Sequence, residues 1–102
     1  MANYRRESLA VEAAEVLAIQ ALGFIAQDDE RLGRFLALTG IGPAEIREAA
    51  RERHFLAGVL DYVIGDEDLL VAFAGHAGVE PPTIRIARRA LAEPASEAGG
   101  EA

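Results

Sequence analysis

The chain has 102 residues, of which 51% are hydrophobic, so it is long and apolar enough for one domain with a packed core. It contains no cysteine, which excludes disulfides, thiolate metal sites and thiol catalysis. The formal net charge of −7 opposes binding to polyanions such as DNA or an anionic membrane surface.

The N-terminal segment has some features of an export signal, because two arginines precede the apolar stretch at 9–26. Glu12 and Glu15 interrupt that stretch, which continues with helical spacing, so we interpret it as a folded helix and not as a signal peptide. The same acidic residues argue against a membrane span. We therefore expect a cytoplasmic protein whose residues 1–7 form a flexible leader.

The first expected helix runs from about Ser8 to about Gln27. Its apolar residues cover most of the circumference, which predicts a helix buried on nearly all sides. An acidic triplet that begins at Asp28 then supplies an N-cap and a negatively charged first turn for a second helix, expected at 31–38.

Gly40 is placed to end this second helix, because glycine adopts the left-handed conformation at little cost. Ile41 can then fold back on Leu36, as in a Schellman ending. Pro43 is suited to the first position of a short third helix, expected to reach about Arg51.

The second half of the chain repeats these steps. Its expected elements are a helix at about 52–64, a helix that Asp66 caps and Gly78 ends, a helix from Pro81 or Pro82 to about Ala92, and a disordered tail at 93–102. Aligned at an offset of 38 positions, residues 22–51 and 60–89 share ten identities in thirty. The identical pairs include Asp28/Asp66, Leu32/Leu70, Phe35/Phe73, Gly40/Gly78 and Pro43/Pro81.

An internal period of this size is typical of one supersecondary unit used twice. We therefore predict an all-α fold, a compact bundle of about six helices built as two pseudo-symmetric three-helix repeats. The repeats should span about 8–51 and 52–92 of a single domain. Phe35 and Phe73 should occupy equivalent core positions.

The titratable residues suggest no catalytic arrangement. Both acidic triplets precede helices, where carboxylates accept hydrogen bonds from free N–H groups, so we interpret them as caps and not as metal ligands. His54 and His76 lack metal-ligand spacing and are interpreted as surface residues. We assign no catalytic, cofactor-binding or metal-binding residue, expect no cofactor and predict that the chain is not an enzyme. A pocket that held both His54 and Asp61 would contradict this prediction.

The turn at 39–43, Thr-Gly-Ile-Gly-Pro, resembles a helix-hairpin-helix motif, in which backbone N–H groups bind a nucleic-acid phosphate. It departs from that motif in three respects: Ile46 stands where a small residue is expected, the second copy has Glu80 in place of Gly42, and the net charge of the chain is acidic. The residues of this alternative nucleic-acid site are Gly40 and Gly42 of the turn and five outward arginines, Arg47, Arg51, Arg85, Arg88 and Arg89.

Gly23 and Gly58 fall inside expected helices, where glycine costs roughly 0.8–1.0 kcal/mol relative to alanine. Close approach of the two central helices would explain both glycines, and we favour that interpretation. The alternative is that the polar stripe of these two helices forms the surface on which a partner binds; its residues are Val16, Gln20, Gly23 and Gln27 on the first helix and His54, Gly58, Asp61 and Gly65 on the fourth.

The run LAIQALGFIAQDDERLGRFLALTGIGPAEIR at 17–47, followed by FLAGVLDYVIGDEDLLVAFAGHAG at 55–78, resembles a small alphaproteobacterial family, domain of unknown function 3572. The resemblance implies a short, helical bacterial protein and supplies no activity or site residues. We expect a non-catalytic protein-interaction or adaptor module with a protein partner, and neither a membrane nor a nucleic acid as its main target. Function is expected where the two copies differ or where their surfaces meet a partner.

Overall fold

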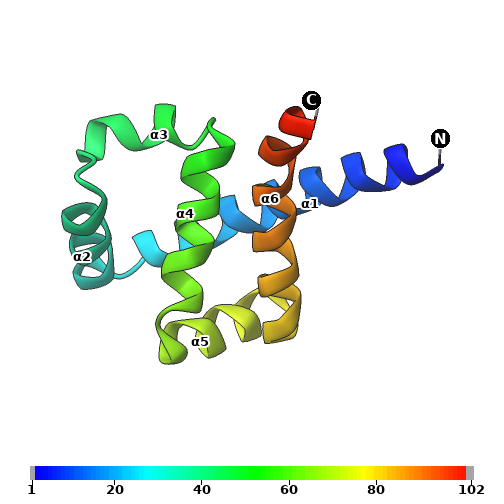
Figure 1. The fold of residues 1–102 in the computed structure, drawn as a ribbon. Coiled ribbons are helices and arrows are strands. Elements are labelled where there is room, and N and C mark those ends of the chain that lie inside the picture. Colours follow the sequence, from blue (N-terminus) through cyan, green and yellow to red (C-terminus); the bar gives the residue numbers. More distant parts are fainter. Residues whose placement is uncertain (1, 101–102) are drawn as a thin grey trace.

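Three helices form the centre of the fold: α1 (Ala2–Ala26), α4 (Arg53–Ile64) and α6 (Pro81–Gly100) pack against one another (Figure 1). This computed structural model describes the side chains of residues 10–91. The predicted leader at 1–7 and the predicted tail at 93–102 lie outside these residues.

The other elements surround this centre. They are α2 (Asp29–Thr39), the 3-10 turn η1 (Pro43–Glu45), α3 (Ile46–Ala49) and α5 (Glu67–Ala77). The described part of the chain contains helices and no strand, so the predicted compact all-α fold of about six helices is confirmed. The third predicted helix, at 43–51, is instead the short pair η1 and α3.

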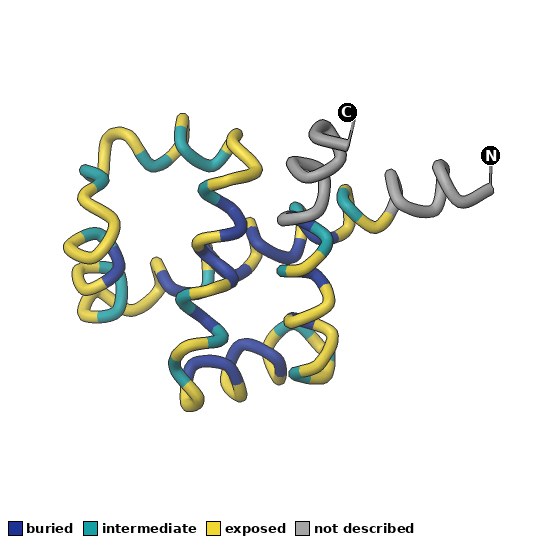
Figure 2. Tube along the Cα trace, viewed as in Figure 1, coloured by how far each residue is buried: buried dark blue, intermediate teal, exposed yellow. Residues whose placement is uncertain are grey.

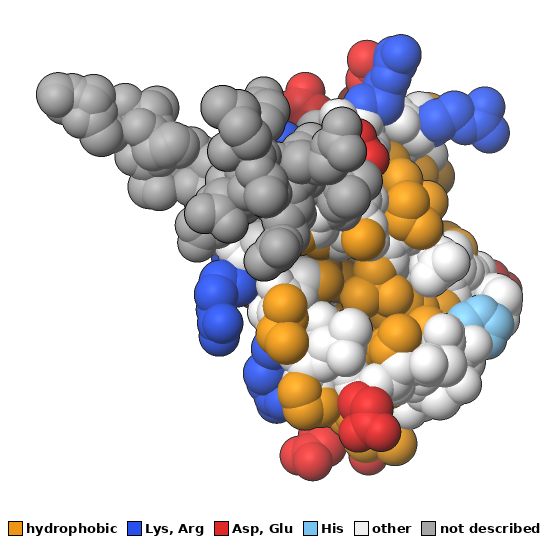
Figure 3. Space-filling view, turned by 90° about the vertical axis from the view of Figure 1, so that its right-hand side faces the viewer, with side chains coloured by type: hydrophobic (Ala, Val, Ile, Leu, Met, Phe, Trp, Pro, Cys, Tyr) orange, Lys and Arg blue, Asp and Glu red, His pale blue; other side chains and the backbone are white. Residues whose placement is uncertain are grey.

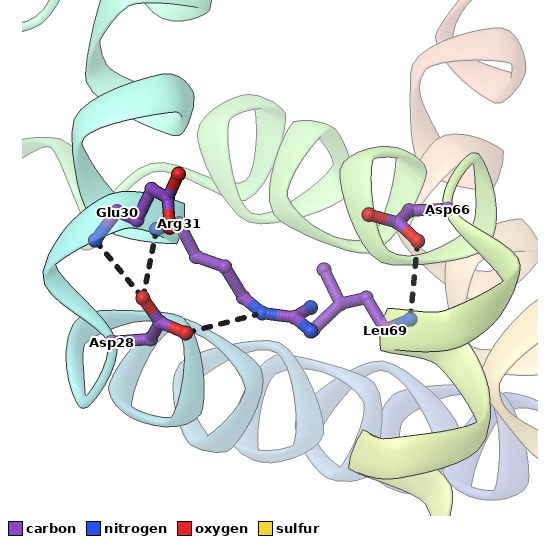
Figure 4. A network of polar contacts seen from close by, with 5 residues as sticks. All are labelled: Asp28, Glu30, Arg31, Asp66 and Leu69. Atoms are coloured by element: carbon purple, nitrogen blue, oxygen red, sulfur yellow. Dashed lines mark hydrogen bonds and ion pairs between the residues drawn. The ribbon is translucent and has the colours of Figure 1, made fainter.

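The two acidic triplets cap helices, as predicted (Figure 4). Asp28 accepts hydrogen bonds from the backbone N–H groups of Glu30 and Arg31 at 2.9 and 3.2 Å, and Asp66 accepts one from Leu69 at 3.2 Å. The hydrogen bond from the Arg31 backbone is the main reason that the pKa of Asp28 lies below its ordinary value. The caps thus satisfy N–H groups that have no partner inside the helix.

The two helix-ending glycines both adopt the left-handed conformation, with φ of 75° at Gly40 and 74° at Gly78. After Gly78, the N–H of Val79 donates back to the carbonyl of Ala74 at 3.0 Å, which is the Schellman pattern. The backbone around Gly40 differs, because the N–H of Ile41 donates to Oγ1 of Thr39 at 3.3 Å. The Thr39 hydroxyl thus accepts from the N–H group that would donate to the carbonyl of Leu36 in a Schellman ending.

The predicted core phenylalanines are confirmed, since Phe35 and Phe73 are 1% and 0% exposed. The prediction that α1 is buried on nearly all sides was wrong. Val16 and Ile19 are 56% and 50% exposed, because α1 packs on its neighbours through one face only. Apolar periodicity identified the helix, but it could not show which apolar residues would find a partner.

The element boundaries of the two copies coincide at the 38-residue offset. Helix α2 spans 29–39 and α5 spans 67–77, while α1 ends at Ala26 and α4 at Ile64. The pseudo-symmetric packing of the two three-helix repeats is not confirmed, because the third helical segments of the two copies pack differently.

Helix α6 buries its apolar face, whereas the matching segment of the first copy does not. Ile84, Ala87 and Leu91 of α6 are buried. Ile46 and Ala49 at the equivalent positions are only half-buried, and Arg53 replaces the leucine and is exposed. Figure 2 shows the segment from η1 to α3 in yellow and teal, without a buried residue. The segment from η1 to α3 therefore covers the centre incompletely.

The helical glycines do not mark a close approach, so our favoured interpretation was wrong. A Cβ atom built on Gly23 or Gly58 would meet nothing within 4 Å, and both residues are exposed. The stripe that carries them faces outward on α1 and α4.

Among the described residues, no single helix is long and apolar enough to cross a membrane. Residues Ala10–Ala26 of α1 are long and apolar enough for a membrane span only when α2 is added to them. The two segments are bent by 119° at the break between them.

Candidate functional site

A hollow of about 580 Å³ opens between α2, the segment from η1 to α3, and α4, on the left of α4 in Figure 1. We call it the α2–α4 hollow. Ten residues line it: Phe35, Thr39, Ile41, Glu45, Glu48, Ala49, Glu52, His54, Phe55 and Gly58. It lies where the first copy's third helix fails to pack as α6 does.

The floor of the α2–α4 hollow is apolar. Phe35 is buried there, and its ring lies edge-on to the rings of Phe55 and Tyr62, with centroids 5.9 and 5.2 Å apart. Ile41 and Ala49 are half-buried beside them. Gly58 adds no side chain, and the space where its Cβ would stand is open.

Three glutamates line the same hollow. Glu45 is the last residue of η1, Glu48 lies in α3 and Glu52 is the residue before α4, and all three side chains line the hollow. Arg47 and Arg51 alternate with them in the sequence but do not line the hollow. The lining of the hollow from this segment is therefore acidic.

The rim carboxylates are only lightly neutralised. Oε1 of Glu45 accepts a hydrogen bond from the N–H of Gly42 at 3.1 Å. Glu48 lies 3.6 Å from the Arg51 guanidinium, but the two side chains are 80% and 75% exposed, so this ion pair is weak. Among the described residues, no ion pair involves Glu45 or Glu52.

The Gly-Ile-Gly turn does not present free donors to a phosphate. The N–H of Gly40 donates to the carbonyl of Leu36 at 2.9 Å, and the N–H of Ile41 donates to Thr39. The N–H of Gly42 donates to the carboxylate of Glu45, whose negative charge would also repel a phosphate. The geometry of this turn therefore favours a structural role.

The structure does not bring the five candidate arginines onto one face. Arg47 is exposed on α3 and Arg51 is exposed just after it, whereas Arg85 and Arg89 are exposed on α6, and α4 stands between these two groups (Figure 1). Arg88 is half-buried and bound to Asp61, and its hydrogen bonds to that carboxylate raise the pKa of Arg88. Nucleic-acid binding through these residues stays a prediction.

The two histidines are exposed, as predicted. His54 lines the α2–α4 hollow, but Asp61 does not, because its carboxylate is held by Arg88. His76 stacks on Phe24 at 4.8 Å between ring centroids. Among the described residues, no group of three histidine, aspartate or glutamate side chains could hold a metal ion.

The glutamates of the hollow were not among the site residues predicted from the sequence. A signal for them exists in the comparison of the two copies. Glu45, Glu48 and Glu52 align at the 38-residue offset with Thr83, Ile86 and Ala90. They are therefore absent from the shared folding unit.

Other exposed apolar side chains lie outside the hollow. They are Val16 and Ile19 on α1, Leu38 on α2, Val71 on α5 and Ile86 on α6. Figure 3 shows the side of the molecule on which α6 lies in Figure 1, where hydrophobic side chains gather centrally and charged ones lie around them. The five large exposed apolar residues themselves belong to four different helices.

Comparison with known proteins finds no match among curated proteins and none among solved structures. One family matches residues 11–94, a range that begins within α1 and ends within α6. The chain therefore belongs to the family described as "Protein of unknown function (DUF3572)".

Proposed function

We propose that this chain is a non-catalytic protein-interaction module of the cytoplasm, which holds a segment of a partner protein in the α2–α4 hollow. The observation that carries the proposal is the hollow itself, about 580 Å³, whose apolar surface comes from the half-buried Ile41, Ala49 and Phe55 above the buried ring of Phe35. Apolar surface that stays open in a folded monomer is a feature of interaction sites.

The exposure of the hollow favours a macromolecule over a small ligand. Small-ligand pockets enclose most of the surface of the bound molecule. Here six of the ten lining residues are exposed, so a small ligand would stay largely in water. A segment of a larger partner can cover the floor and still contact the exposed rim.

The side chains around the hollow support a binding role and not catalysis. His54 is exposed at the rim, and among the described residues it forms no hydrogen bond or ion pair with a carboxylate; Asp61 is bound by Arg88. A general acid–base pair needs its members within hydrogen-bond reach of a common substrate atom.

Position-specific photo-crosslinking in the native host tests the proposal. A photoreactive phenylalanine replaces His54, an exposed residue of the hollow, and in a control chain it replaces Val71, which is 58% exposed on α5. We expect discrete adducts with another protein from position 54 and not from position 71.

A filled hollow provides the second control. Because the Cβ space of Gly58 is open and borders the hollow, Gly58→Met should occupy it without disturbing the core. We expect this change to remove the adduct at position 54, and Gly23→Met on α1 to leave it. Equal adducts at positions 54 and 71, no adduct at 54, or an adduct with the mass of two copies of this chain would contradict the proposal.

A further inference from the structure

The charge around the α2–α4 hollow indicates the chemistry of its partner. We propose that the bound segment is basic and amphipathic, with arginine or lysine side chains opposite Glu45, Glu48 and Glu52 and apolar side chains on the floor. This inference rests on the proposed function, because it describes the partner of the same hollow.

The first argument is the arrangement of carboxylates over apolar surface. The half-buried Phe55, Ile41 and Ala49 form the accessible floor above Phe35, and the three glutamates line the same space. Arginine and lysine have long apolar stems and a charged end, so one such side chain can cover a phenylalanine and reach a carboxylate. An acidic or purely polar segment would leave one of these two surfaces unmatched.

The second argument is that the described residues neutralise the hollow only weakly, through the exposed ion pair between Glu48 and Arg51. Among the lining residues, only His54 is of a basic type, and Arg47 and Arg51 do not line the hollow. Complementary charge on a partner increases the association rate and disfavours wrong partners.

The third argument is that the fold does not require these glutamates. The second copy builds the corresponding segment with Thr83, Ile86 and Ala90, and its apolar face packs against α1 and α4. The three glutamates therefore occur only in the copy whose third segment leaves a hollow, and this supports a role in recognising a partner more than a role in folding.

Three synthetic peptides of equal length, titrated against the full chain by fluorescence anisotropy, test the inference. The first carries leucine and arginine at helical spacing, the second has glutamate in place of arginine, and the third has serine in place of leucine. We expect the first to bind at least about tenfold more tightly than either of the others. Equal binding of the acidic peptide, or no binding of the basic amphipathic peptide, would overturn the inference.

Matched charge variants separate local recognition from attraction by the whole chain. Replacing Glu48 and Glu52 with glutamine changes the net charge from −7 to −5, because each substitution removes one negative charge. The control replaces Glu12 and Glu67, which are exposed and lie outside the hollow, and changes the net charge equally. We expect the Glu48 and Glu52 substitutions to weaken binding of the basic peptide by about three- to fivefold per glutamate. The control substitutions should weaken it much less.

The outcomes also distinguish this inference from the proposed function. If both pairs of charge substitutions weakened binding of the basic peptide equally, or if the peptide bound Gly58→Met as tightly as the unsubstituted chain, the inference of a basic partner at the hollow would be overturned. Crosslinking from position 54 that persists when Glu48 and Glu52 are replaced would leave the proposed function intact and reject only the basic chemistry.

Discussion

Arg88 on α6 donates two hydrogen bonds to the Asp61 carboxylate on α4, from Nε at 2.6 Å and from Nη2 at 2.9 Å. At the 38-residue offset the same positions in the first copy hold Ala50 and Gly23, which cannot form this pair. The third helix of the second copy is thus attached to its central helix by a polar contact in addition to its apolar face. The segment from η1 to α3 lacks that contact, and the α2–α4 hollow lies beside it.

A double-mutant cycle with Asp61→Asn and Arg88→Gln should give a coupling free energy of about 0.5–1 kcal/mol in urea unfolding. The two hydrogen bonds between these side chains favour a measurable coupling free energy, while the 56% exposure of the Asp61 side chain keeps it small. Arg89→Gln, at an exposed neighbouring position, should change the free energy of unfolding by less than about 0.5 kcal/mol. A coupling of zero would show that the pair does not hold α6 in place.

Phe35→Ala and Phe73→Ala should each lower the free energy of unfolding by about 3–5 kcal/mol, because both rings are fully buried. Leu38→Ala is the control, since Leu38 is 74% exposed and should change stability little. Urea denaturation measured by circular dichroism compares the three variants. Unchanged midpoints for the phenylalanine variants would contradict their placement in the core.

Gly23→Ala and Gly58→Ala should each stabilise the chain by about 0.5–1 kcal/mol, because alanine favours helix and nothing obstructs its Cβ. Gly40→Ala should do the opposite, since its φ of 75° suits glycine alone. Thermal unfolding of the three variants gives the signs. A loss of stability in the first two would restore the interpretation that these glycines permit a close helix contact.

The sequence was sufficient for features that depend on near neighbours. Asp28, Gly40 and Pro43 act through hydrogen bonds and dihedral angles within one turn, so their roles could be predicted from residue type and position. The open face of α1 and the α2–α4 hollow depend on which helices meet in space. Glu48 and Glu52 have the pattern of an ordinary solvated helix face until the position of α4 is known.

Arg31→Leu should leave the free energy of unfolding unchanged or raise it by up to about 1 kcal/mol. The side chain extends from α2 toward Leu69 (Figure 4), and its Nη1 is buried without a hydrogen-bond partner. Its contact with Asp28 is long, 3.7 Å, and half-exposed, so little is lost with it. Leucine is also the residue at the equivalent position of the second copy. A clear loss of stability would mean that a polar partner satisfies Nη1.

The part of the Asp28 cap that depends on the carboxylate charge should be lost in acid. Its backbone hydrogen bonds, foremost the one from Arg31, lower the pKa of Asp28 in the folded chain below the unfolded value of about 3.9. Stability from a lowered carboxyl pKa is fully present above the unfolded value and is lost as the pH falls through the folded value. Urea unfolding should therefore show wild type more stable than Asp28→Ala at neutral pH, with the difference shrinking below about pH 4. Asp28→Asn, which keeps an acceptor oxygen without a titrating group, should differ from Asp28→Ala by an amount that does not vary with pH. If the difference between wild type and Asp28→Ala persisted unchanged in acid, the carboxylate charge would have no part in the cap.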